Sequence, residues 1–343
     1  MKALVLADYA RLVYQDVPEP EAGPQDVLVQ VRACGICGSD VHGMDGSTGR
    51  RIPPVIMGHE AAGVIAALGS AVGGWRLGDR VTFDSTIYCG ECFYCRRGLI
   101  NLCDNRRVLG VSCDEYRRDG AMAEYVAVPQ HVLYRLPDAV SFVQAATVEP
   151  LSIAVHAVGR TPVSIADTAL VIGAGAVGLC VVQVLRVAGC GQIIAVDLDR
   201  TRLELACRLG ADAGLHAKED DVVAEVLKLT AQRGADVALE VVGFSQTINL
   251  AIACLRKGGC LTLVGTYAQT AELPLQSVVY RQLSLNGTVA SNGEYPACLD
   301  LIARSAVEMD ALVSAVVPLA DGADWFERLH RAEAGLMKVI LTP

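Results

Sequence analysis

One glycine-rich hexapeptide limits the possible folds of this chain more than any other feature. It reads Gly173-Ala174-Gly175-Ala176-Val177-Gly178. An apolar run, 169–172, precedes it, a helical pattern follows it, and the next apolar run, 192–196, ends at Asp197, nineteen residues after Gly178. A strand, a glycine turn, a helix and an acidic residue after the second strand are typical of a dinucleotide-binding βαβ unit. The sequence therefore predicts an α/β fold with a doubly wound parallel sheet in its second half.

Each glycine of the motif has its own expected role. Gly173 permits the tight turn, Gly175 lets backbone N–H groups approach a pyrophosphate, and Gly178 lets the helix pack closely on the strand. The helix N-terminus adds partial positive charge for the phosphates. Asp197 can accept hydrogen bonds from the ribose hydroxyls and would repel a 2′-phosphate, so the motif favours NAD over NADP. The structural alternative is a glycine-rich turn that binds no ligand.

Strands and helices continue to alternate after the motif. Asp199 is the expected N-cap of a helix that has Cys207 on its apolar face. Two further buried strands are predicted at 236–242 and 260–264, with Lys257-Gly258-Gly259 as the helix stop before the second. Alternation of this kind indicates a parallel sheet with helices on both faces.

Length and charge exclude several classes of protein. The 343 residues suggest about two domains, and 52% apolar against 20% charged residues excludes a disordered chain. The net charge of −9 argues against nucleic acid as a partner. The longest uncharged stretch, 168–185, is interrupted by three glycines, so no membrane span is expected. The apolar run 3–7 is too short for a secretion signal, and we expect a cytoplasmic protein.

The first 150 residues have a different composition. Prolines and a glycine cluster, 43–49, interrupt short apolar runs such as 27–31, a pattern of short strands and turns. We expect an irregular, β-rich domain there. The tail of the chain adds a predicted helix at 296–304 and a closing strand at 338–341.

Four closely spaced cysteines form the second signal. They read Cys89-x2-Cys92-x2-Cys95-x7-Cys103. Four thiolates at this spacing can close a tetrahedral Zn²⁺ site that has no open position, which is a structural site. The chain has 13 cysteines, an odd number, and it is too long for a small disulfide-based domain, which favours metal binding. The alternative is four reduced cysteines without a metal.

Candidates for a catalytic site are dispersed along the chain. Cys37 lies in CGICGSDVH, His59 and Glu60 lie in GHE, and Glu149 lies in EPLS. A thiolate, an imidazole and a carboxylate would suit a catalytic zinc whose fourth position stays open. Each residue alone has an ordinary alternative: a buried thiol, a hydrogen-bonded histidine, a carboxylate at a helix start. Spacing cannot join residues that lie 90 positions apart.

A family resemblance joins them. CGICGSDVH, GHE, the four-cysteine segment, EPLS and GAGAVG, in this order, resemble the zinc-dependent medium-chain dehydrogenases/reductases, and most of all their sorbitol (polyol) dehydrogenase branch. The resemblance covers the chain from Met1 to Pro343. It implies a GroES-like catalytic domain at 1–151 with a structural zinc lobe at about 86–108, a Rossmann NAD-binding domain at 152–289, and a return to the catalytic domain at 290–343.

The same resemblance implies two Zn²⁺ per chain. Cys37, His59 and Glu149 match the catalytic zinc ligands. Glu60 matches a nearby carboxylate that can exchange with water or substrate as a ligand. Cys89 and its three partners match the structural site.

Other positions match the family's proton relay and cofactor contacts. Ser39 and His42 match the relay, and Arg202 matches an arginine beside the adenosine ribose. Gly265 and Thr266 match backbone on the nicotinamide side. The resemblance also implies a homo-oligomer, either a dimer or a tetramer.

The implied reaction is the reversible oxidation of a secondary alcohol of a polyol to a ketone with NAD. Two departures leave the substrate open: Gly43 stands where the sorbitol enzymes have a tyrosine, and segment 287–295 lacks their pocket arginine. Alternatives are a sugar-alcohol phosphate dehydrogenase, for which arginine pairs near the four cysteines would bind phosphate, an L-threonine 3-dehydrogenase-like enzyme, and a non-catalytic NAD-binding protein.

Overall fold

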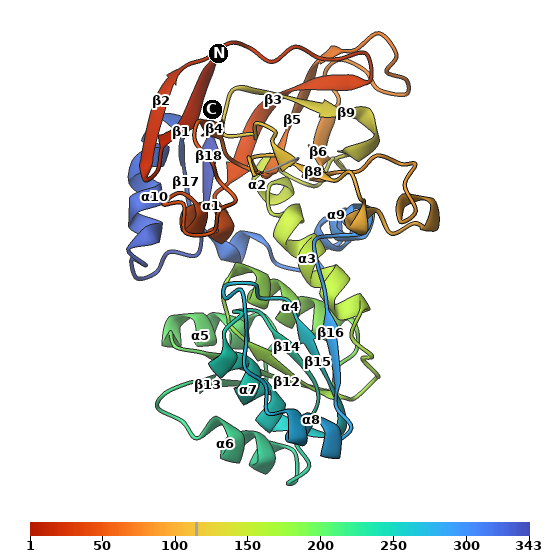
Figure 1. The fold of residues 1–343 in the computed structure, drawn as a ribbon, viewed down its shortest axis with the longest axis vertical. Coiled ribbons are helices and arrows are strands. Elements are labelled where there is room, and N and C mark those ends of the chain that lie inside the picture. Colours follow the sequence, from red (N-terminus) through yellow and green to blue (C-terminus); the bar gives the residue numbers. More distant parts are fainter. Residues whose placement is uncertain (114–115) are drawn as a thin grey trace. The chain divides into compact units, whose positions relative to one another are not determined.

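The computed structural model describes residues 1–113 and 116–343, and its chain forms two compact units (Figure 1). Unit 1 consists of residues 1–149, 291–305 and 309–343. Unit 2 consists of residues 150–290 and 306–308. The chain therefore leaves unit 1, builds nearly all of unit 2, and returns.

Unit 2 is built on a six-stranded parallel sheet. In chain order its strands are β11 (Thr168–Ile172), β12 (Gln192–Asp197), β13 (Ala213–His216), β14 (Ala235–Glu240), β15 (Leu255–Leu263) and β16 (Ser284–Gly287). Their order across the sheet is β13-β12-β11-β14-β15-β16, and every neighbouring pair is parallel. This is the doubly wound order of a Rossmann fold, so the predicted fold class is confirmed.

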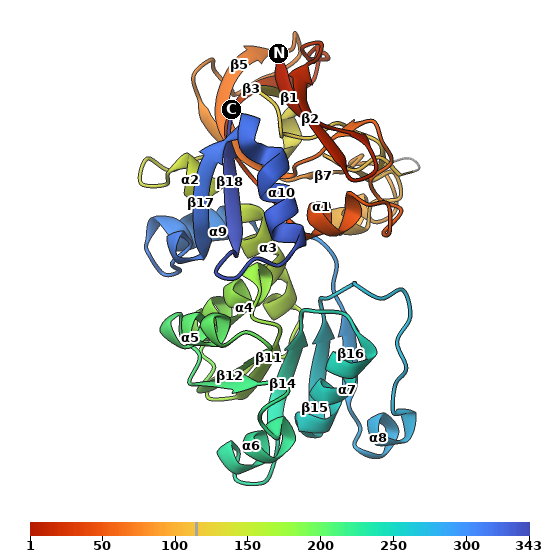
Figure 2. The ribbon, with the colours of Figure 1, turned by 90° about the vertical axis from the view of Figure 1, so that its left-hand side faces the viewer.

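Helices cover both faces of this sheet (Figure 2). They are α4 (Ala176–Val187), α5 (Arg200–Arg208), α6 (Val222–Leu229), α7 (Ser245–Cys254) and α8 (Leu275–Tyr280). Helix α4 packs beside α5, and α6 packs beside α7. Strand β11 is buried along its whole length, as expected for a central parallel strand that is covered on both sides.

Two details of unit 2 differ from the sequence-based prediction. Asp199 does cap α5, accepting from the backbone N–H groups of Thr201 and Arg202, but Cys207 is exposed rather than part of the core. Strand β15 begins at Leu255, so the segment 257–259 lies inside the strand and not in a helix stop. The pairing register of β15 with β14 shifts at this point, which accommodates the two glycines as an irregularity.

Unit 1 is rich in β-structure and surrounds a separate apolar core. Its strands are β1 (Lys2–Asp8), β2 (Arg11–Asp16), β3 (Asp26–Gly35), β4 (Val55–Ile56), β5 (Glu60–Leu68), β6 (Arg80–Phe83), β7 (Thr86–Ile87), β8 (Arg107–Val108), β9 (Tyr125–Pro129), β10 (Leu133–Arg135), β17 (Val313–Pro318) and β18 (Lys338–Thr342). Seven of them form one sheet, ordered β10-β6-β5-β3-β18-β17, with β9 also pairing with β3. Strand β18 thus lies between β3 and β17, in the interior of the sheet (Figure 2).

Short helices connect the strands of unit 1. They are α1 (Gly38–Gly43), η1 (Cys95–Arg97), η2 (Ile100–Leu102), η4 (Gln130–Val132), α2 (Phe142–Ala145), α9 (Tyr295–Ala303), η5 (Asp310–Leu312), η6 (Leu319–Asp321) and α10 (Gly322–His330). Helix α3 (Val148–Gly159) begins at the end of unit 1 and continues into unit 2. Within the described ranges, no helix combines the length and apolar character that crossing a bilayer requires.

Candidate metal centres and nucleotide site

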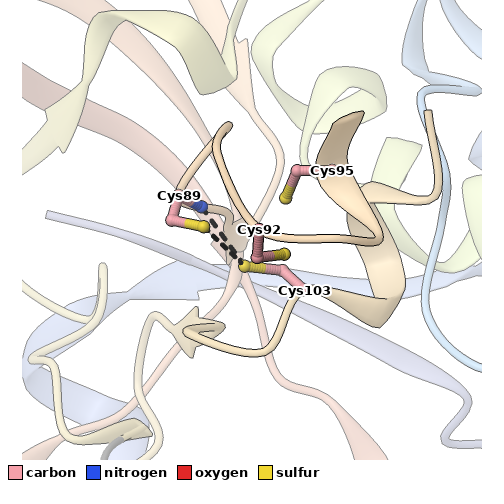
Figure 3. A group of neighbouring side chains, drawn as sticks. All are labelled: Cys89, Cys92, Cys95 and Cys103. Atoms are coloured by element: carbon pink, nitrogen blue, oxygen red, sulfur yellow. Dashed lines mark hydrogen bonds between the residues drawn. The ribbon is translucent and has the colours of Figure 1, made fainter. Parts of the chain in front are cut away.

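The four predicted zinc-binding cysteines converge within one loop of unit 1 (Figure 3). The loop follows β7, turns at glycines with positive φ such as Gly90 and Gly98, and contains the two short helices η1 and η2. The four sulfur atoms all lie within 4.8 Å of one another, and those of Cys89 and Cys103 are 3.5 Å apart. Zn–S bonds of about 2.3 Å in a tetrahedron place sulfurs about 3.8 Å apart, so the group fits a closed S₄ zinc site.

Backbone amides prepare part of this group for the thiolate state. Hydrogen bonds from the backbone N–H groups of Glu91 and Cys92 lower the pKa of Cys89 to about 6. Backbone N–H groups, with Cys95 first among their sources, also lower the pKa of Cys92. None of the 13 cysteines, all of which lie in the described ranges, forms a disulfide. The thiols are therefore available as metal ligands.

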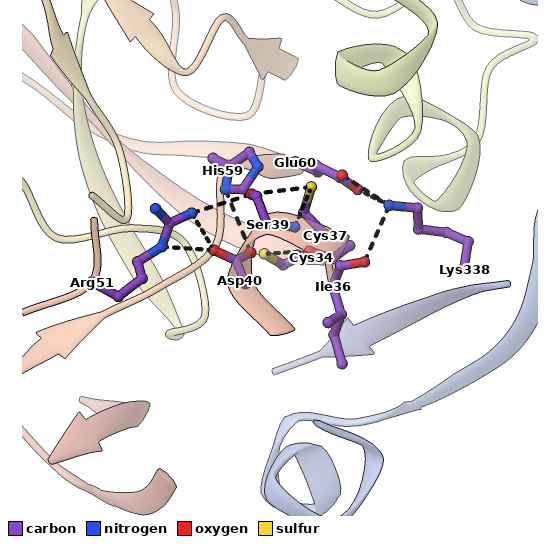
Figure 4. A network of polar contacts seen from close by, with 10 residues as sticks. Cys34, Ile36, Cys37, Ser39, Asp40, Arg51, His59, Glu60 and Lys338 are labelled. Carbon is purple, nitrogen blue, oxygen red and sulfur yellow. Dashed lines mark hydrogen bonds and ion pairs between the residues drawn. The ribbon is translucent and has the colours of Figure 1, made fainter. Parts of the chain in front are cut away.

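A second group of ligand atoms lies in unit 1 around Cys37 and His59 (Figure 4). Cys37 is the N-cap of α1, His59 follows β4, and Glu60 is the first residue of β5. One ligand atom from each of these three lies within 4.8 Å of the others. Gly35 pairs with Glu60 across the sheet, and a Cβ at Gly35 would lie 2.3 Å from Oε2 of Glu60, so the glycine leaves room for the carboxylate. A thiolate, an imidazole and a carboxylate in this arrangement fit an open zinc site.

Glu149 lies near this group but outside its set of mutual close distances. It stands in the first turn of α3, and burial raises its pKa to about 7, with the charge of His59 lowering the value and that of Glu60 raising it. The structure therefore gathers Cys37 and His59 with Glu60 most closely. Glu149, which the resemblance places first among the carboxylate ligands, stays a predicted ligand.

Buried ion pairs surround the three ligand atoms. Lys338, at the start of β18, donates from Nζ to both oxygens of Glu60 at 2.8 and 2.7 Å and to the carbonyl oxygen of Ile36 at 3.1 Å. Asp40 Oδ2 lies 3.4 Å from His59 Nδ1. Burial alone would raise the pKa of Asp40, but the charges of His59 and Arg51 hold it well below its usual range. These partners fix the ligands in place, as metal sites require.

The two predicted relay residues both lie on α1. Ser39 donates from Oγ to the sulfur of Cys37 at 3.3 Å and also contacts Arg51. His42 is exposed one turn further along the helix, and partial burial together with the charge of His330 lowers its pKa. Ser39 thus touches the metal-ligand group directly, while His42 lies toward the surface.

Asp84 adds another buried carboxylate to unit 1. It follows β6 and accepts hydrogen bonds from the backbone N–H of Thr86 at 2.8 Å and from Oγ of Ser291 at 2.9 Å. Both partners are neutral, so burial raises the pKa of Asp84 to about 6. Its charge in turn raises the pKa of Glu149.

In unit 2, the glycine motif forms the turn between β11 and α4. Gly173 has φ +100°, and a Cβ there would lie 2.7 Å from Cγ2 of Val242. A Cβ at Gly178 would lie 1.8 Å from the carbonyl oxygen of Gly173, so helix and turn touch. A Cβ at Gly175, the N-cap of α4, would meet nothing within 4 Å. The tight turn, the close packing and the open position match the three expected roles, and half-buried Val177 lies in the first turn of α4.

Asp197 ends β12 and faces the glycine turn. Its carboxylate accepts from the backbone N–H of Ala174 at 2.6 Å and from those of Leu198 and Asp199 at 2.8 and 3.0 Å. Arg202 lies in the first turn of α5, with Nε 3.7 Å from Asp199. These contacts place the Asp197 carboxylate at the glycine turn, where the ribose of a dinucleotide would bind, and the Arg202 guanidinium next to Asp199.

Gly265 and Thr266 follow the carboxyl end of β15 in unit 2. A Cβ at Gly265 would lie 2.3 Å from the backbone nitrogen of Gly243, so this position requires glycine for close backbone packing. Thr266 is exposed at the same sheet edge. Ligands of doubly wound sheets bind at the carboxyl ends of the strands, which is where both residues lie.

The sequence-based assignment missed several charged residues at these sites. Asp40 lies inside the quoted CGICGSDVH motif, and Lys338 is a single charge at the start of an otherwise apolar strand. Either feature could have marked a buried charge. Nothing local marked Arg51 or Asp84, whose partners only the fold reveals.

Comparisons with known proteins agree with this geometry. Residues 23–138 match the family model "Alcohol dehydrogenase GroES-like domain", and residues 176–304 match "Zinc-binding dehydrogenase". The chain belongs to the zinc-dependent medium-chain dehydrogenases/reductases, a family of alcohol and polyol dehydrogenases.

Its similarity to individual members extends over the whole chain. It is 34% identical to a sorbitol dehydrogenase of Bacillus subtilis, covering 100% of this chain and 97% of that one. It is 31% identical to a D-arabitol-phosphate dehydrogenase of Enterococcus avium, covering 97% and 94%. A protein of Sinorhizobium meliloti solved with NADP bound superimposes with a TM-score of 0.91 at 32% identity, covering 100% and 99%.

Proposed function

We propose that this protein is an NAD-dependent polyol dehydrogenase that oxidises a secondary hydroxyl to a ketone and works reversibly. The observation that carries the proposal is the group of half-buried Cys37 and buried His59 and Glu60, which offers three zinc ligands of the catalytic type. The polyol-dehydrogenase relatives support the substrate class. The nucleotide motif of unit 2 supports the cofactor.

The two predicted metals would have different tasks. Zinc held by Cys37, His59 and a carboxylate would act as a Lewis acid toward the substrate hydroxyl, and NAD would accept the hydride. We assign Glu149 as the third ligand of the working site and Glu60 as the exchanging carboxylate. Zinc at Cys89, Cys92, Cys95 and Cys103 would hold the loop and take no part in the reaction.

The chain's own groups would move the proton. Ser39 Oγ, beside Cys37, accepts the hydroxyl proton as it gives up its own proton toward His42, and His42, which is exposed on α1, releases a proton to solvent. Replacing His42 with alanine should therefore slow oxidation by about 10²-fold below pH 8 and leave the zinc content unchanged. An unchanged pH–rate profile of the variant would reject this relay.

The choice of NAD rests on Asp197. Its carboxylate, already held by three backbone N–H groups, would repel a 2′-phosphate. We expect kcat/KM with NAD to exceed that with NADP by about tenfold or more, and Asp197→Ser to narrow the difference. The Sinorhizobium relative was solved with NADP bound, so the choice between the two cofactors needs a direct test. Equal kcat/KM with NAD and NADP would overturn the role assigned to Asp197.

A substrate panel tests the reaction itself. Purified protein with NAD should reduce the cofactor with free polyols, and metal analysis should find two zinc ions per chain. Activity only with polyol phosphates would favour the phosphate alternative, activity with threonine the amino-acid alternative, and cofactor binding without turnover a non-catalytic protein. Against phosphate, four guanidinium groups near the cysteine loop donate to backbone carbonyls: those of Arg97, Arg106, Arg117 and Arg118.

An exposed apolar face of unit 2 supports the proposal that the protein self-associates. Helix α8 exposes Leu275, Val279 and Tyr280 by 69%, 59% and 79%, and β16 beside it is the edge strand of the sheet. We propose that a second copy covers this face in a dimer or tetramer. Light scattering of Tyr280→Glu should show a smaller species than the unaltered protein.

The free cysteines suit a reducing compartment, and we propose a cytoplasmic location.

A further inference from the structure

Arg51 carries a charge in the interior of unit 1. It lies in the loop between α1 and β4, and only 2% of it is exposed. A guanidinium removed from water is strongly unfavourable unless anions and hydrogen-bond acceptors satisfy it. The groups that satisfy Arg51 therefore indicate the role of this buried charge.

Those partners lead to two zinc ligands at once (Figure 4). Arg51 donates from Nε and Nη2 to Oδ1 of Asp40 at 3.1 and 2.7 Å, and Oδ2 of Asp40 faces His59 Nδ1 at 3.4 Å. The same Nη2 donates to Oγ of Ser39 at 3.3 Å, and Ser39 donates to the sulfur of Cys37, also at 3.3 Å. One planar group thus stands behind both His59 and Cys37.

The geometry sets the orientation of each intermediate group. With Oδ1 of Asp40 held by Arg51, the carboxylate presents Oδ2 to Nδ1 of His59, which leaves Nε2 of the imidazole as the ligand atom. With a lone pair of Ser39 Oγ taken by Nη2, the hydroxyl hydrogen points to Cys37. A guanidinium can hold both because its donors are arranged in a rigid fork.

Gly43 makes room for this side chain. A Cβ at Gly43 would lie 2.8 Å from Cγ of Arg51 and 3.3 Å from Oγ1 of Thr48. Cγ is close to the backbone of Arg51, so the side chain could not avoid the contact by moving its end alone. The absence of a Cβ at position 43 is therefore matched to the presence of the arginine.

We propose that Arg51 is a positioning residue for the reaction, fixing the Asp40–His59 pair and the relay hydroxyl of Ser39 together, and that Gly43 provides the space that admits it. The inference rests on the proposed function in one respect: the Cys37–His59 group must hold zinc. Metal release reports on Arg51 independently of any substrate.

The first experiment compares Arg51→Met and Arg51→Lys in the full-length, zinc-loaded protein. Zinc release to a chromogenic chelator should be about tenfold or more faster at the catalytic site of Arg51→Met and unchanged at the four-cysteine site. Its kcat should fall about 10- to 100-fold, with a smaller change in KM. Arg51→Lys keeps the charge beside Asp40 but not the fork, so zinc release should stay near that of the unaltered protein while kcat remains low.

Arg80→Met is the matched control for a partly buried arginine. Arg80 donates to the carbonyl oxygens of Pro137, Asp138 and Val140 and contacts none of the ligand group. It should lower the melting temperature and leave zinc release unchanged. Equal zinc release and kcat in Arg51→Met and the unaltered protein would overturn the proposal, whereas failure of the unaltered protein to hold catalytic zinc would overturn the proposed function instead.

A double-mutant cycle tests the pairing with Gly43. Gly43→Ala alone should displace Arg51 and speed zinc release, but it should add nothing in an Arg51→Ala background, because alanine has no Cγ to meet the new Cβ. The same effect of Gly43→Ala in both backgrounds would show that the two residues are unrelated. Gly43→Ala and Arg51→Lys keep the proposal testable if Arg51→Met does not fold.

Discussion

The two groups of metal-type ligands in unit 1 are built by opposite means. The four-cysteine group comes from 15 consecutive residues, is bordered mainly by backbone amides and other thiols, and has three of its four members only partly buried. The group of Cys37, His59 and Glu60 is assembled from two segments of the chain, the start of α1 and the start of β5, and is enclosed by charged side chains, of which Lys338 is the most distant in sequence.

The difference shows where each site obtains its rigidity. The loop has few apolar contacts of its own, so its order would depend on the metal. The Cys37–His59–Glu60 group is held by ion pairs and sheet pairing among protein residues, so its geometry does not require a fourth protein ligand. Four experiments, ordered by expected effect, test this contrast.

Loss of one thiolate should abolish activity at the buried site without disturbing the fold. Cys37→Ser should lower kcat by about 10³-fold or more, because the Lewis-acid contribution is worth several kcal/mol. Circular dichroism should remain native and the four-cysteine zinc should stay bound. The exposed Cys207→Ser is the control and should behave as the unaltered protein. Full activity of Cys37→Ser with two zinc ions bound would refute the assignment.

Removing the compensating charge should cost stability at the buried site. Lys338→Met leaves Glu60 ionised without its partner, which should lower the free energy of unfolding by about 3–5 kcal/mol. The double variant Glu60→Gln/Lys338→Met should recover most of the loss in urea titrations. If the single and double variants are equally unstable, the ion pair is not what holds Glu60.

Loss of one ligand from the four-cysteine loop should lower stability rather than remove a catalytic group. Cys95→Ser leaves three thiolates, and loss of this cross-link over 15 residues should cost about 2–3 kcal/mol, seen as a lower melting temperature in calorimetry. Brief chelation of the unaltered protein should remove the catalytic zinc first and leave the loop zinc in place. Release in the opposite order would contradict the distinction between closed and open sites.

Asp84 tests how a buried carboxylate without a charged partner changes the stability of the fold with pH. Because its pKa is raised to about 6, its contribution to stability is fully present below about pH 4 and is lost as the pH rises through 6. Asp84→Asn should therefore be more stable than the unaltered protein by about 2–3 kcal/mol at pH 7.5 and equal to it near pH 4. Calorimetry between pH 4 and pH 7.5 measures this difference in stability between the variant and the unaltered protein. A difference that does not change with pH would show that Asp84 does not titrate as described.

The same contrast explains how much the sequence could predict. The glycine motif with Asp197 and the four cysteines are local patterns, and the structure places their residues together as the spacing implies. Cys37, His59 and Glu149 could be joined only through the family resemblance. The sequence could not pair Lys338 with Glu60, because 278 positions separate them, and Arg51, only 11 positions from Asp40, carries no mark of burial in its own segment.

Two local features of unit 2 could not be predicted from the sequence for a related reason. Gly258 and Gly259 are typical of a helix end, yet the sheet absorbs them inside β15 through a shift in register. Cys207 has the spacing of a core residue on α5 but lies beside the apolar stripe and is exposed. The helix α5 was predicted correctly, whereas the segment 257–259, expected as a helix stop, belongs to the strand β15.

The interior position of β18 has a consequence for synthesis on the ribosome. Its residues emerge after all other described elements, but it lies between β3 and β17 and supplies Lys338 to Glu60. Most of unit 2 is continuous in the chain and can fold as soon as it emerges. Unit 1 cannot complete its largest sheet until β18 has emerged, and until then Glu60 lacks the counter-charge of Lys338. The nascent protein would therefore gain its nucleotide-binding half first, and the metal-binding half would close only when the last strand is released.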